Sequence, residues 1–203
     1  NEKAVGWMQG RMEFGPRALG GRSIIADPRS PNMQKQLNLK VKYRESFRPF
    51  APSVLREDVS DWFEHESDSP YMLLVSNVKN DKRHSMTEGE KALFGIDKLN
   101  IPRSSVPAIT HVDYSARIQT VNADTNPRYH AVISKFKEKT KCPLVVNTSF
   151  NVRGEPIICS PTDAFKCFMG TQIDVLAVGN YMLYKEQQNT SLIKNYEERY
   201  ELD

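Results

Sequence analysis

The order of apolar and polar positions along the chain predicts a mixture of strands and helices. Apolar or alternating runs bounded by turn residues predict strands at residues 4–9, 47–55, 71–78, 106–113, 116–121 and 142–149, and a strand pair at 173–185. Apolar positions at helical spacing, or short capped segments, predict helices at residues 31–40, 58–65, 126–140 and 160–171. Because these elements alternate irregularly, we expect an α/β (α+β) domain with a mixed, twisted sheet and packed helices.

Glycine, proline and charged residues mark the segments between these elements. Residues 10–23 contain several glycines and Pro16, so we expect a loop with at most one turn of helix. Residues 79–103 are polar and irregular in pattern, which is typical of a surface insertion. The residues from Glu186 onward form a charged tail that is either helical or disordered. We expect the structured part of the chain to end near residue 185.

The composition excludes some classes of protein but does not alter the predicted elements. The 203 residues are 39% hydrophobic and 26% charged, which is ordinary for a globular protein with a substantial core. No apolar run reaches the roughly 18 residues that a membrane helix needs, so we expect no membrane partner. The net charge of +3 is too small to indicate nucleic-acid binding by bulk charge. Cys142, Cys159 and Cys167 lack metal-ligand spacing, so we expect reduced thiols in a cytoplasmic protein.

A cluster of hydrogen-bonding side chains follows the predicted strand in PLVVNTSFNVRGEPI, residues 143–157. Asn147, Ser149 and Asn151 stand where a core strand would ordinarily stay apolar. Side chains two positions apart in an extended chain point to the same face, so Ser149 and Asn151 should lie side by side. Together with backbone N–H groups of the following turn, they could bind an oxyanion. A simple turn-initiating cluster is the alternative.

Two basic segments also indicate the binding of an anion. Lys42, Arg44 and Arg48 lie in KVKYRESFRPFAP, directly before an apolar strand, so these cations should lie at the rim of the core. Lysine supplies a compact charge and arginine a planar fork that suits phosphate oxygens. HVDYSARIQTV places Arg117 and Thr120 in a strand-like run, where an arginine requires an acidic partner or an anionic ligand. These segments therefore predict one shared anion site.

The combination of these motifs resembles a known family. K-x-R followed by R-P-F-A, with T-S-x-N-x-x-G-x-P about a hundred residues later, is similar to the nucleotide-binding signature of the YrdC-like fold. With EFGPRALGGRSI at residues 13–24 and HVDYSARIQTV, the chain resembles the C-terminal domain of the O-carbamoyltransferases of nodulation factors and antibiotics. The similarity extends from Val5 to about Lys185.

The resemblance implies a two-site enzyme. In that family the C-terminal domain binds ATP and carbamoyl phosphate and forms carbamoyl-adenylate, with Mg²⁺ on the nucleotide. An N-terminal kinase-like domain, which carries Fe²⁺ or another metal, then passes the carbamoyl group to a hydroxyl acceptor. Residues 1–30 would be a junction with that missing domain, residues 31–185 the carbamoyl-adenylate-forming domain, and residues 186–203 a tail. The chain begins with Asn1 and is expected to be part of a longer protein, so we expect no complete transfer from it.

Site residues follow from matching positions in the motifs. The resemblance implies that Lys42, Arg44 and Arg117 are catalytic, and that no metal is bound by this chain. The same matching and the polar clusters above predict that the nucleotide contacts Lys42, Arg44, Arg48, Arg117, Thr120, Asn147, Ser149 and Asn151. Arg17, in GPRALG, is expected at the junction rather than at the phosphates. One position departs from the family pattern, because Tyr114 stands where glycine is expected.

Two other functions remain open from the sequence. An RNA-binding module of the same fold would use a basic concave face, although we find no aromatic and basic stacking surface of the kind that single-stranded RNA prefers. A stand-alone threonylcarbamoyl-adenylate synthase is the third possibility, which the GPRALG block disfavours. The four histidines lack ligand spacing, so nothing in the sequence predicts a metal site. Neither the acceptor hydroxyl nor the oligomeric state follows from these residues.

Overall fold

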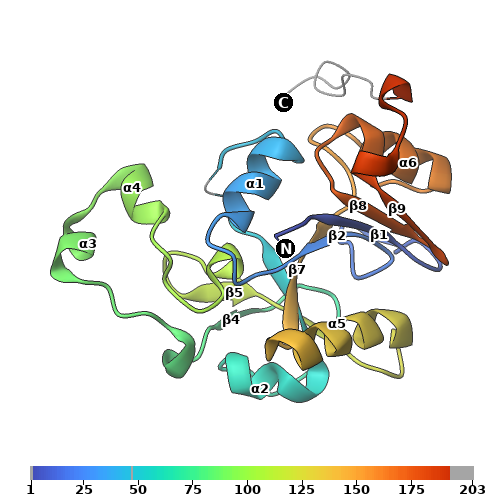
Figure 1. Ribbon diagram of the computed structural model, residues 1–203. Helices are drawn as coiled ribbons and strands as arrows, with labels where there is room; N and C mark the ends of the chain where they lie inside the picture. Colours follow the sequence, from blue (N-terminus) through green and yellow to red (C-terminus); the bar gives the residue numbers. More distant parts are fainter. Residues whose placement is uncertain (1, 47, 193–203) are drawn as a thin grey trace.

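The computed structural model describes residues 2–46 and 48–192, and its centre is a seven-stranded sheet (Figure 1). The strands follow one another across the sheet as β6 (Gln119–Val121), β3 (Ala51–Leu55), β7 (Leu144–Ser149), β2 (Arg22–Ala26), β1 (Val5–Met8), β8 (Val175–Val178) and β9 (Tyr181–Tyr184). Strands β1 and β8 pair in parallel, as do β3 and β6, whereas the other neighbours are antiparallel. The mixed α/β fold expected from the sequence is confirmed.

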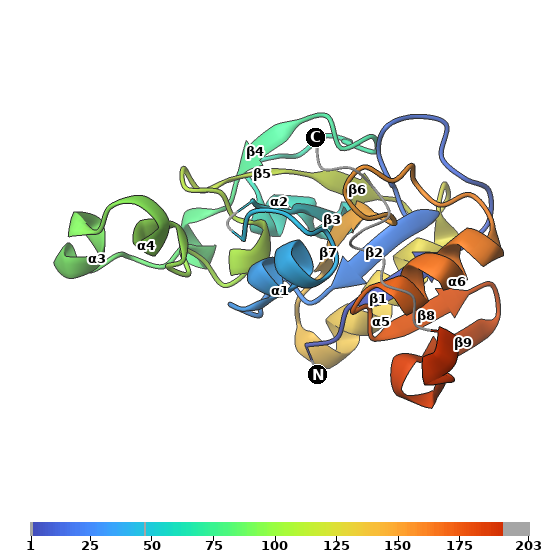
Figure 2. The same ribbon diagram turned by 90° about the horizontal axis from the view of Figure 1, so that it is seen from above.

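Helices cover both faces of this sheet. Helices α1 (Met33–Lys40) and α6 (Pro161–Gly170) lie on one face, and α5 (Pro127–Thr140) lies on the other (Figures 1 and 2). Alternate residues of β7 serve the two faces. Leu144 and Val146 belong to the core cluster that includes residues of α1 and α6, whereas Val145 packs in the cluster with residues of α5. This alternation explains why β7 is apolar along its first half.

A second, two-stranded sheet lies beside the main one. It pairs β4 (Val75–Asn77) with β5 (Ser115–Arg117) in antiparallel register. Short helices complete this side: α2 (Val59–Trp62), α3 (Glu88–Ala92) and α4 (Gly95–Leu99), with 3₁₀ turns η1 (Arg56–Asp58), η2 (Asn80–Lys82) and η3 (Pro107–Ile109). Figure 1 shows α3 and α4 projecting away from the sheet, within the expected surface insertion. Within the described residues, the helices are too short or too polar for a membrane-crossing segment.

Several predicted elements form close to their expected bounds, and others do not. The helices at 31–40, 126–140 and 160–171 are confirmed, and Ser160 forms a capping box with Asp163. The strand expected at 106–113 is wrong, because a 3₁₀ turn begins at Pro107, which has no N–H to donate to a sheet. The strand expected at 71–78 is confined to β4. Strand β2 was missed, because the adjoining glycines favoured a loop.

The expected division at residue 30 does not separate two parts of the fold. Strands β1 and β2, which come from residues 1–30, lie in the interior of the main sheet between β7 and β8. The segment is therefore part of the main sheet, and its expected role as a junction with a further domain stays a prediction. At the other end, the chain continues from β9 through the 3₁₀ turns η4 (Lys185–Gln187) and η5 (Thr190–Leu192). Most of the expected tail, residues 193–203, lies outside the described residues.

Candidate functional site

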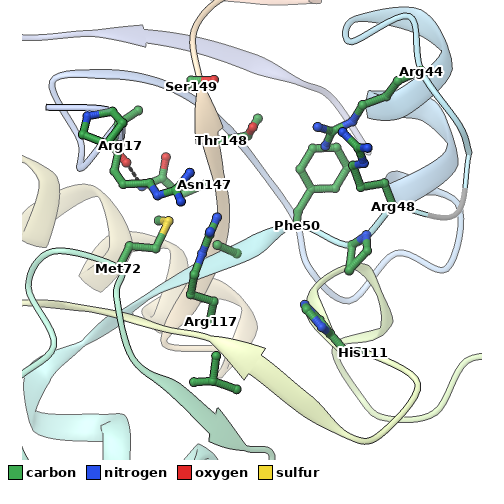
Figure 3. Close-up of a pocket in the computed structure, with 15 residues that line it drawn as sticks. Arg17, Arg44, Arg48, Phe50, Met72, His111, Arg117, Asn147, Thr148 and Ser149 are labelled. Carbon is green, nitrogen blue, oxygen red and sulfur yellow. Dashed lines mark hydrogen bonds between the residues drawn. The ribbon is translucent and has the colours of Figure 1, made fainter. Parts of the chain in front are cut away.

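A cavity of about 420 Å³ opens between the main sheet, the β4–β5 ribbon and the loop after α1. We call it the arginine cavity, because its lining includes Arg17, Arg44, Arg48 and Arg117. Figure 3 shows these side chains around the cavity, together with Asn147, Thr148 and Ser149 of β7. Of the residues predicted from the sequence, Arg44, Arg48, Arg117, Asn147 and Ser149 line it. Three segments that are distant in sequence therefore meet here.

Arg117 reaches the cavity from the end of β5, where it lies opposite Val75 of β4. Its Nε atom is buried and has no hydrogen-bond partner, and the same is true of Nε of Arg17. Burial and the nearby charge of Arg17 lower the pKa of Arg117. No salt bridge to a carboxylate reaches either guanidinium within the described part of the chain. Two neighbouring cations without an acidic partner form an arrangement that suits an anionic ligand.

Arg44 is held from two sides at the opposite wall. Its Nε donates a 2.7 Å hydrogen bond to Oδ1 of Asn38, and its guanidinium lies 5.0 Å from the centre of the Phe50 ring. Burial and the charge of Arg48 lower the pKa of Arg44 to about 10. Arg48 is more exposed, and its guanidinium lies 3.9 Å from the carboxylate of Glu45. Arg44 is therefore the preorganised cation of this pair.

Asn38 fixes the loop that carries both of these arginines, and the sequence analysis missed it. This fully buried residue of α1 donates from Nδ2 to the carbonyl oxygens of Ser46, at 3.1 Å, and Arg48, at 2.8 Å. The backbone carbonyl oxygen of Asn38 accepts a hydrogen bond from the backbone N–H of Arg44. The available signal was an asparagine on the apolar side of a helix, next to Leu37, where a polar side chain needs partners.

The loop of residues 10–21 brings Arg17 into the lining of the cavity, whereas the sequence led us to expect it at a junction with a further domain. Oε1 of Glu13 accepts hydrogen bonds from the backbone N–H groups of Leu19, at 2.7 Å, and Gly21, at 2.6 Å. Nδ2 of Asn147 donates to the carbonyl oxygen of Ala18 at 3.0 Å. These bonds fix the backbone that directly follows Arg17. The loop is thus a wall of the cavity, although it contains no regular helix.

Lys42 lies behind the cavity wall and not among the lining residues. Tyr43 has a left-handed φ of 47°, so the chain is not extended and Lys42 and Arg44 diverge. Nζ of Lys42 donates to the carbonyl oxygens of Ser149, at 2.6 Å, and Asn151, at 2.8 Å, and also contacts Oδ1 of Asn151 at 2.8 Å. Burial lowers the pKa of Lys42 to about 7. This lysine holds the exit of β7 in place.

Asn151 and Thr120 are also turned away from the cavity lining. Oγ of Ser149 donates to Oδ1 of Asn151 at 2.7 Å, so these two side chains do lie side by side. Asn151 then donates from Nδ2 to the carbonyl oxygen of Glu155, within the turn. Oγ1 of Thr120 accepts from the backbone N–H of Ser69 at 2.8 Å, at the edge of the main sheet. Both side chains therefore form hydrogen bonds within the protein.

Thr148 and His111 line the cavity but were not predicted as site residues. Both belong to motifs that the sequence analysis singled out, so the signal was present and only the direction of the side chains was missing. Oδ1 of Asn147 is buried and lacks a hydrogen-bond partner, which adds one unused acceptor beside the arginines. Among the described residues, no group of three or more His, Cys, Asp or Glu side chains could hold a metal ion. Cys142, Cys159 and Cys167 are unpaired.

The fold and the cavity define a mixed α/β domain that gathers arginine side chains around a recess suited to anions. Comparison with known proteins agrees with the motifs that build this recess. Residues 1–185 match the model of the carbamoyltransferase C-terminus. An uncharacterised Synechocystis protein is 60% identical over 200 residues, which are 98% of this chain and 32% of that protein.

Two further relatives have informative names. The nodulation protein NolO of Bradyrhizobium diazoefficiens is 44% identical over 91% of this chain and 31% of its own length. The 3'-hydroxymethylcephem-O-carbamoyltransferase of Streptomyces clavuligerus is 34% identical over 88% of this chain and 30% of its own length. The chain thus spans about a third of the length of these relatives. It belongs to the carbamoyltransferase family, whose C-terminal part it matches.

Proposed function

We propose that this chain is the part of an O-carbamoyltransferase that binds ATP and carbamoyl phosphate and forms carbamoyl-adenylate. The observation that carries the proposal is the arginine cavity, in which the guanidinium groups of Arg17 and Arg117 keep buried Nε atoms without a protein partner. A ligand with several phosphate groups would supply the missing acceptors. Family membership supports the carbamoyl part of the proposal, and the cavity supports the nucleotide part.

The proposed chemistry needs positioning more than proton transfer. Carbamoyl phosphate reacts with water to give carbamate and inorganic phosphate. An oxygen of carbamate then attacks the α-phosphorus of ATP, the bond to the β-phosphate oxygen breaks, and pyrophosphate leaves. Negative charge develops on the leaving oxygens, which the four arginines of the cavity would neutralise. Ser149 and Asn147 line the cavity at the end of β7, but their side-chain donors already bond to Asn151 and Ala18, so they would shape the wall beside the arginines.

Mg²⁺ fits the proposal only as an ion that is bound to the nucleotide. The cavity lining contains no carboxylate, so the protein offers the metal no acidic ligand there. Mg²⁺ would therefore be bound by the phosphate oxygens of ATP and by water, and would supply charge neutralisation. The Fe²⁺ or other metal implied by the resemblance belongs to the N-terminal domain, together with the acceptor hydroxyl. We propose that these lie in the part of the longer protein that this chain does not span.

The role of Lys42 in the proposal differs from that of the arginines. Its ammonium group is already directed at oxygens of Ser149 and Asn151. Lys42 and Asn151 would therefore shape the exit of β7, while Arg44, Arg48 and Arg117 contact the ligand. Thr120, bonded to Ser69, would likewise act only through the fold. This assignment separates residues that bind the anion from residues that hold the wall of the cavity.

Exchange of labelled pyrophosphate into ATP tests the proposed reaction. The purified chain, supplied with ATP, Mg²⁺, carbamoyl phosphate and labelled pyrophosphate, is expected to form labelled ATP only when carbamoyl phosphate is present. The same preparation is expected to transfer no carbamoyl group to an added sugar or cephem hydroxyl. Exchange without carbamoyl phosphate would contradict the proposed acyl donor. Absence of exchange by a chain that binds ATP would contradict adenylate formation.

A further inference from the structure

His111 is the one imidazole in the lining of the arginine cavity, and the proposed function has not used it. It follows η3, and its backbone is fixed by a tight turn. The N–H of His111 donates to the carbonyl oxygen of Ser115 at 2.9 Å, and the N–H of Tyr114 donates to the carbonyl oxygen of His111 at 3.0 Å. Asp113 fastens the same turn by accepting from the N–H and Oγ of Ser115. The backbone of His111 is thus held in place beside the cavity.

Within residues 2–46 and 48–192, the ring of His111 has no hydrogen-bond partner. In the described part of the chain, neither ring nitrogen makes a hydrogen bond, whereas the rings of His65 and His130 do. Figure 3 shows His111 at the rim of the cavity, on the side of Phe50 and Arg48. The residue also borders a second cavity of about 260 Å³ next to α1. A half-buried imidazole between two cavities has room for a ligand on either nitrogen.

The charges around His111 are mostly positive. Cations reach the arginine cavity from the loop before β2, from the loop after α1 and from β5, namely Arg17, Arg44, Arg48 and Arg117. Lys35 of α1 and Arg103 border the second cavity. Asp113, in the same turn, is the acidic neighbour. Burial, opposed by Asp113 and reinforced by Arg117, lowers the pKa of His111, so the ring is neutral at pH 7 in the absence of ligand.

A bound anion with a phosphate group would raise the pKa of His111. It places negative charge among the arginines and offers oxygens to a ring nitrogen, and both effects favour the charged imidazolium. We propose that His111 is a further ligand of the anion and binds it in the protonated form, so that ligand binding takes up a proton at this side chain. This inference rests on the proposed function, because it requires that an anion occupies the arginine cavity. The shared chemistry is a phosphate group, from either ATP or carbamoyl phosphate.

Calorimetric titration in buffers of different ionisation enthalpy measures this proton directly. ATP and carbamoyl phosphate are each titrated at pH 7 into the wild-type chain, His111→Gln and the matched control His84→Gln. His84 is exposed and is not among the lining residues of the arginine cavity. The proton uptake of wild type and His84→Gln should exceed that of His111→Gln by up to one proton per ligand bound. The ligand that shows this difference carries the phosphate that His111 contacts.

The affinity for the ligand should also depend on pH, because the proposed contact requires a protonated His111. Loss of a charge-assisted contact in His111→Gln should weaken binding about tenfold at pH 6 and much less at pH 8. A proton NMR titration of the wild type gives a second readout that needs no variant to fold. One of the four imidazole signals should titrate at a higher pH when ligand is present.

The outcomes separate the two proposals. If both ligands bind and proton uptake is the same in all three proteins, with no shifted imidazole signal, the inference about His111 is overturned and the proposed function stands. If neither ligand binds to the wild type, the proposed function fails and takes the inference with it.

Discussion

Arg117 illustrates what can be inferred from one residue before any fold is known. An arginine in a strand-like run requires a partner, and the structure provides no acidic one for its buried Nε within the described residues. The direction of its side chain, however, depends on the pairing of β5 with β4, which brings Arg117 opposite Val75. That pairing is a long-range contact, so the sequence identified the residue but not the wall of the cavity that it forms.

Replacing Arg117 should weaken nucleotide binding. For Arg117→Ala, the loss of one charge-assisted contact should cost on the order of 1.5–3 kcal/mol of ATP binding free energy. Arg117→Lys should recover only part of this, because lysine lacks the bidentate fork. Titration calorimetry measures the affinities, with Arg29→Ala as a control, since Arg29 pairs with Asp27 away from the cavity lining. Unchanged ATP affinity in Arg117→Ala would remove Arg117 from the site.

Lys42 should give the stability of the protein a pH dependence that can be isolated. Burial lowers its pKa from 10.5 to about 7. Between these values the unfolded chain binds a proton that the folded chain has released, so the free energy of unfolding should rise with pH. The rise can approach about 1.4 kcal/mol per pH unit. Urea denaturation at pH 7, 8 and 9 should show a smaller rise for Lys42→Met than for the wild type. Equal slopes would show that Lys42 stays protonated in the folded state.

Tyr114 stands where the resemblance led us to expect glycine, and its backbone conformation is one that glycine adopts readily. Its φ is 65°, in the left-handed region that glycine adopts most readily, and its ring lies 5.1 Å from the guanidinium of Arg83. Tyr114→Ala and Tyr114→Gly both remove the ring contact, so their difference reports the backbone alone. The glycine variant should have the higher free energy of unfolding, by about 1 kcal/mol. An alanine variant of equal or greater stability would exclude strain at this position.

At the scale of elements, the sequence predicted the helices and strands whose residue pattern is local. It failed for elements that form only because of tertiary contacts. Helix α5 follows from its own apolar spacing and its Asn126 cap. Strand β2 is only five residues long and follows a glycine-rich loop, and it exists because β1 and β7 pair with it on both sides. Residues 106–113 are apolar enough for a strand, but Pro107 opens a 3₁₀ turn. The loop of residues 10–21 is equally dependent on distant partners.

Gly20 tests how tightly that loop is held. Its φ is +106°, and a Cβ atom there would lie 2.3 Å from Cδ1 of Tyr129, a ring that is fully buried. Gly20→Ala should therefore lower the free energy of unfolding by about 3 kcal/mol, from overpacking and backbone strain together. Gly89→Ala is the matched control, because nothing lies within 4 Å of its added Cβ. Thermal or urea denaturation measures both variants, and similar stabilities would show that the loop can move away from α5.

At the scale of the whole molecule, the arrangement of strands explains why residues from distant segments form one site. The end of β7, the loop after α1, the loop before β2 and the end of β5 meet at the arginine cavity. The K-x-R and S-x-N motifs predicted this meeting, yet within each motif only part of the set lines the cavity. Left-handed Tyr43 turns Lys42 inward, and the turn after β7 engages Asn151. Such reversals depend on single backbone angles, which residue patterns do not specify.

The most direct test of the central claim is a crystal structure of this chain with a non-hydrolysable ATP analogue. We predict that the analogue's phosphate groups lie in the arginine cavity, within hydrogen-bonding distance of Arg17 and Arg117, while Lys42 keeps its bonds to Ser149 and Asn151. Phosphate groups bound on another face of the domain, with the arginine cavity left to solvent, would contradict it.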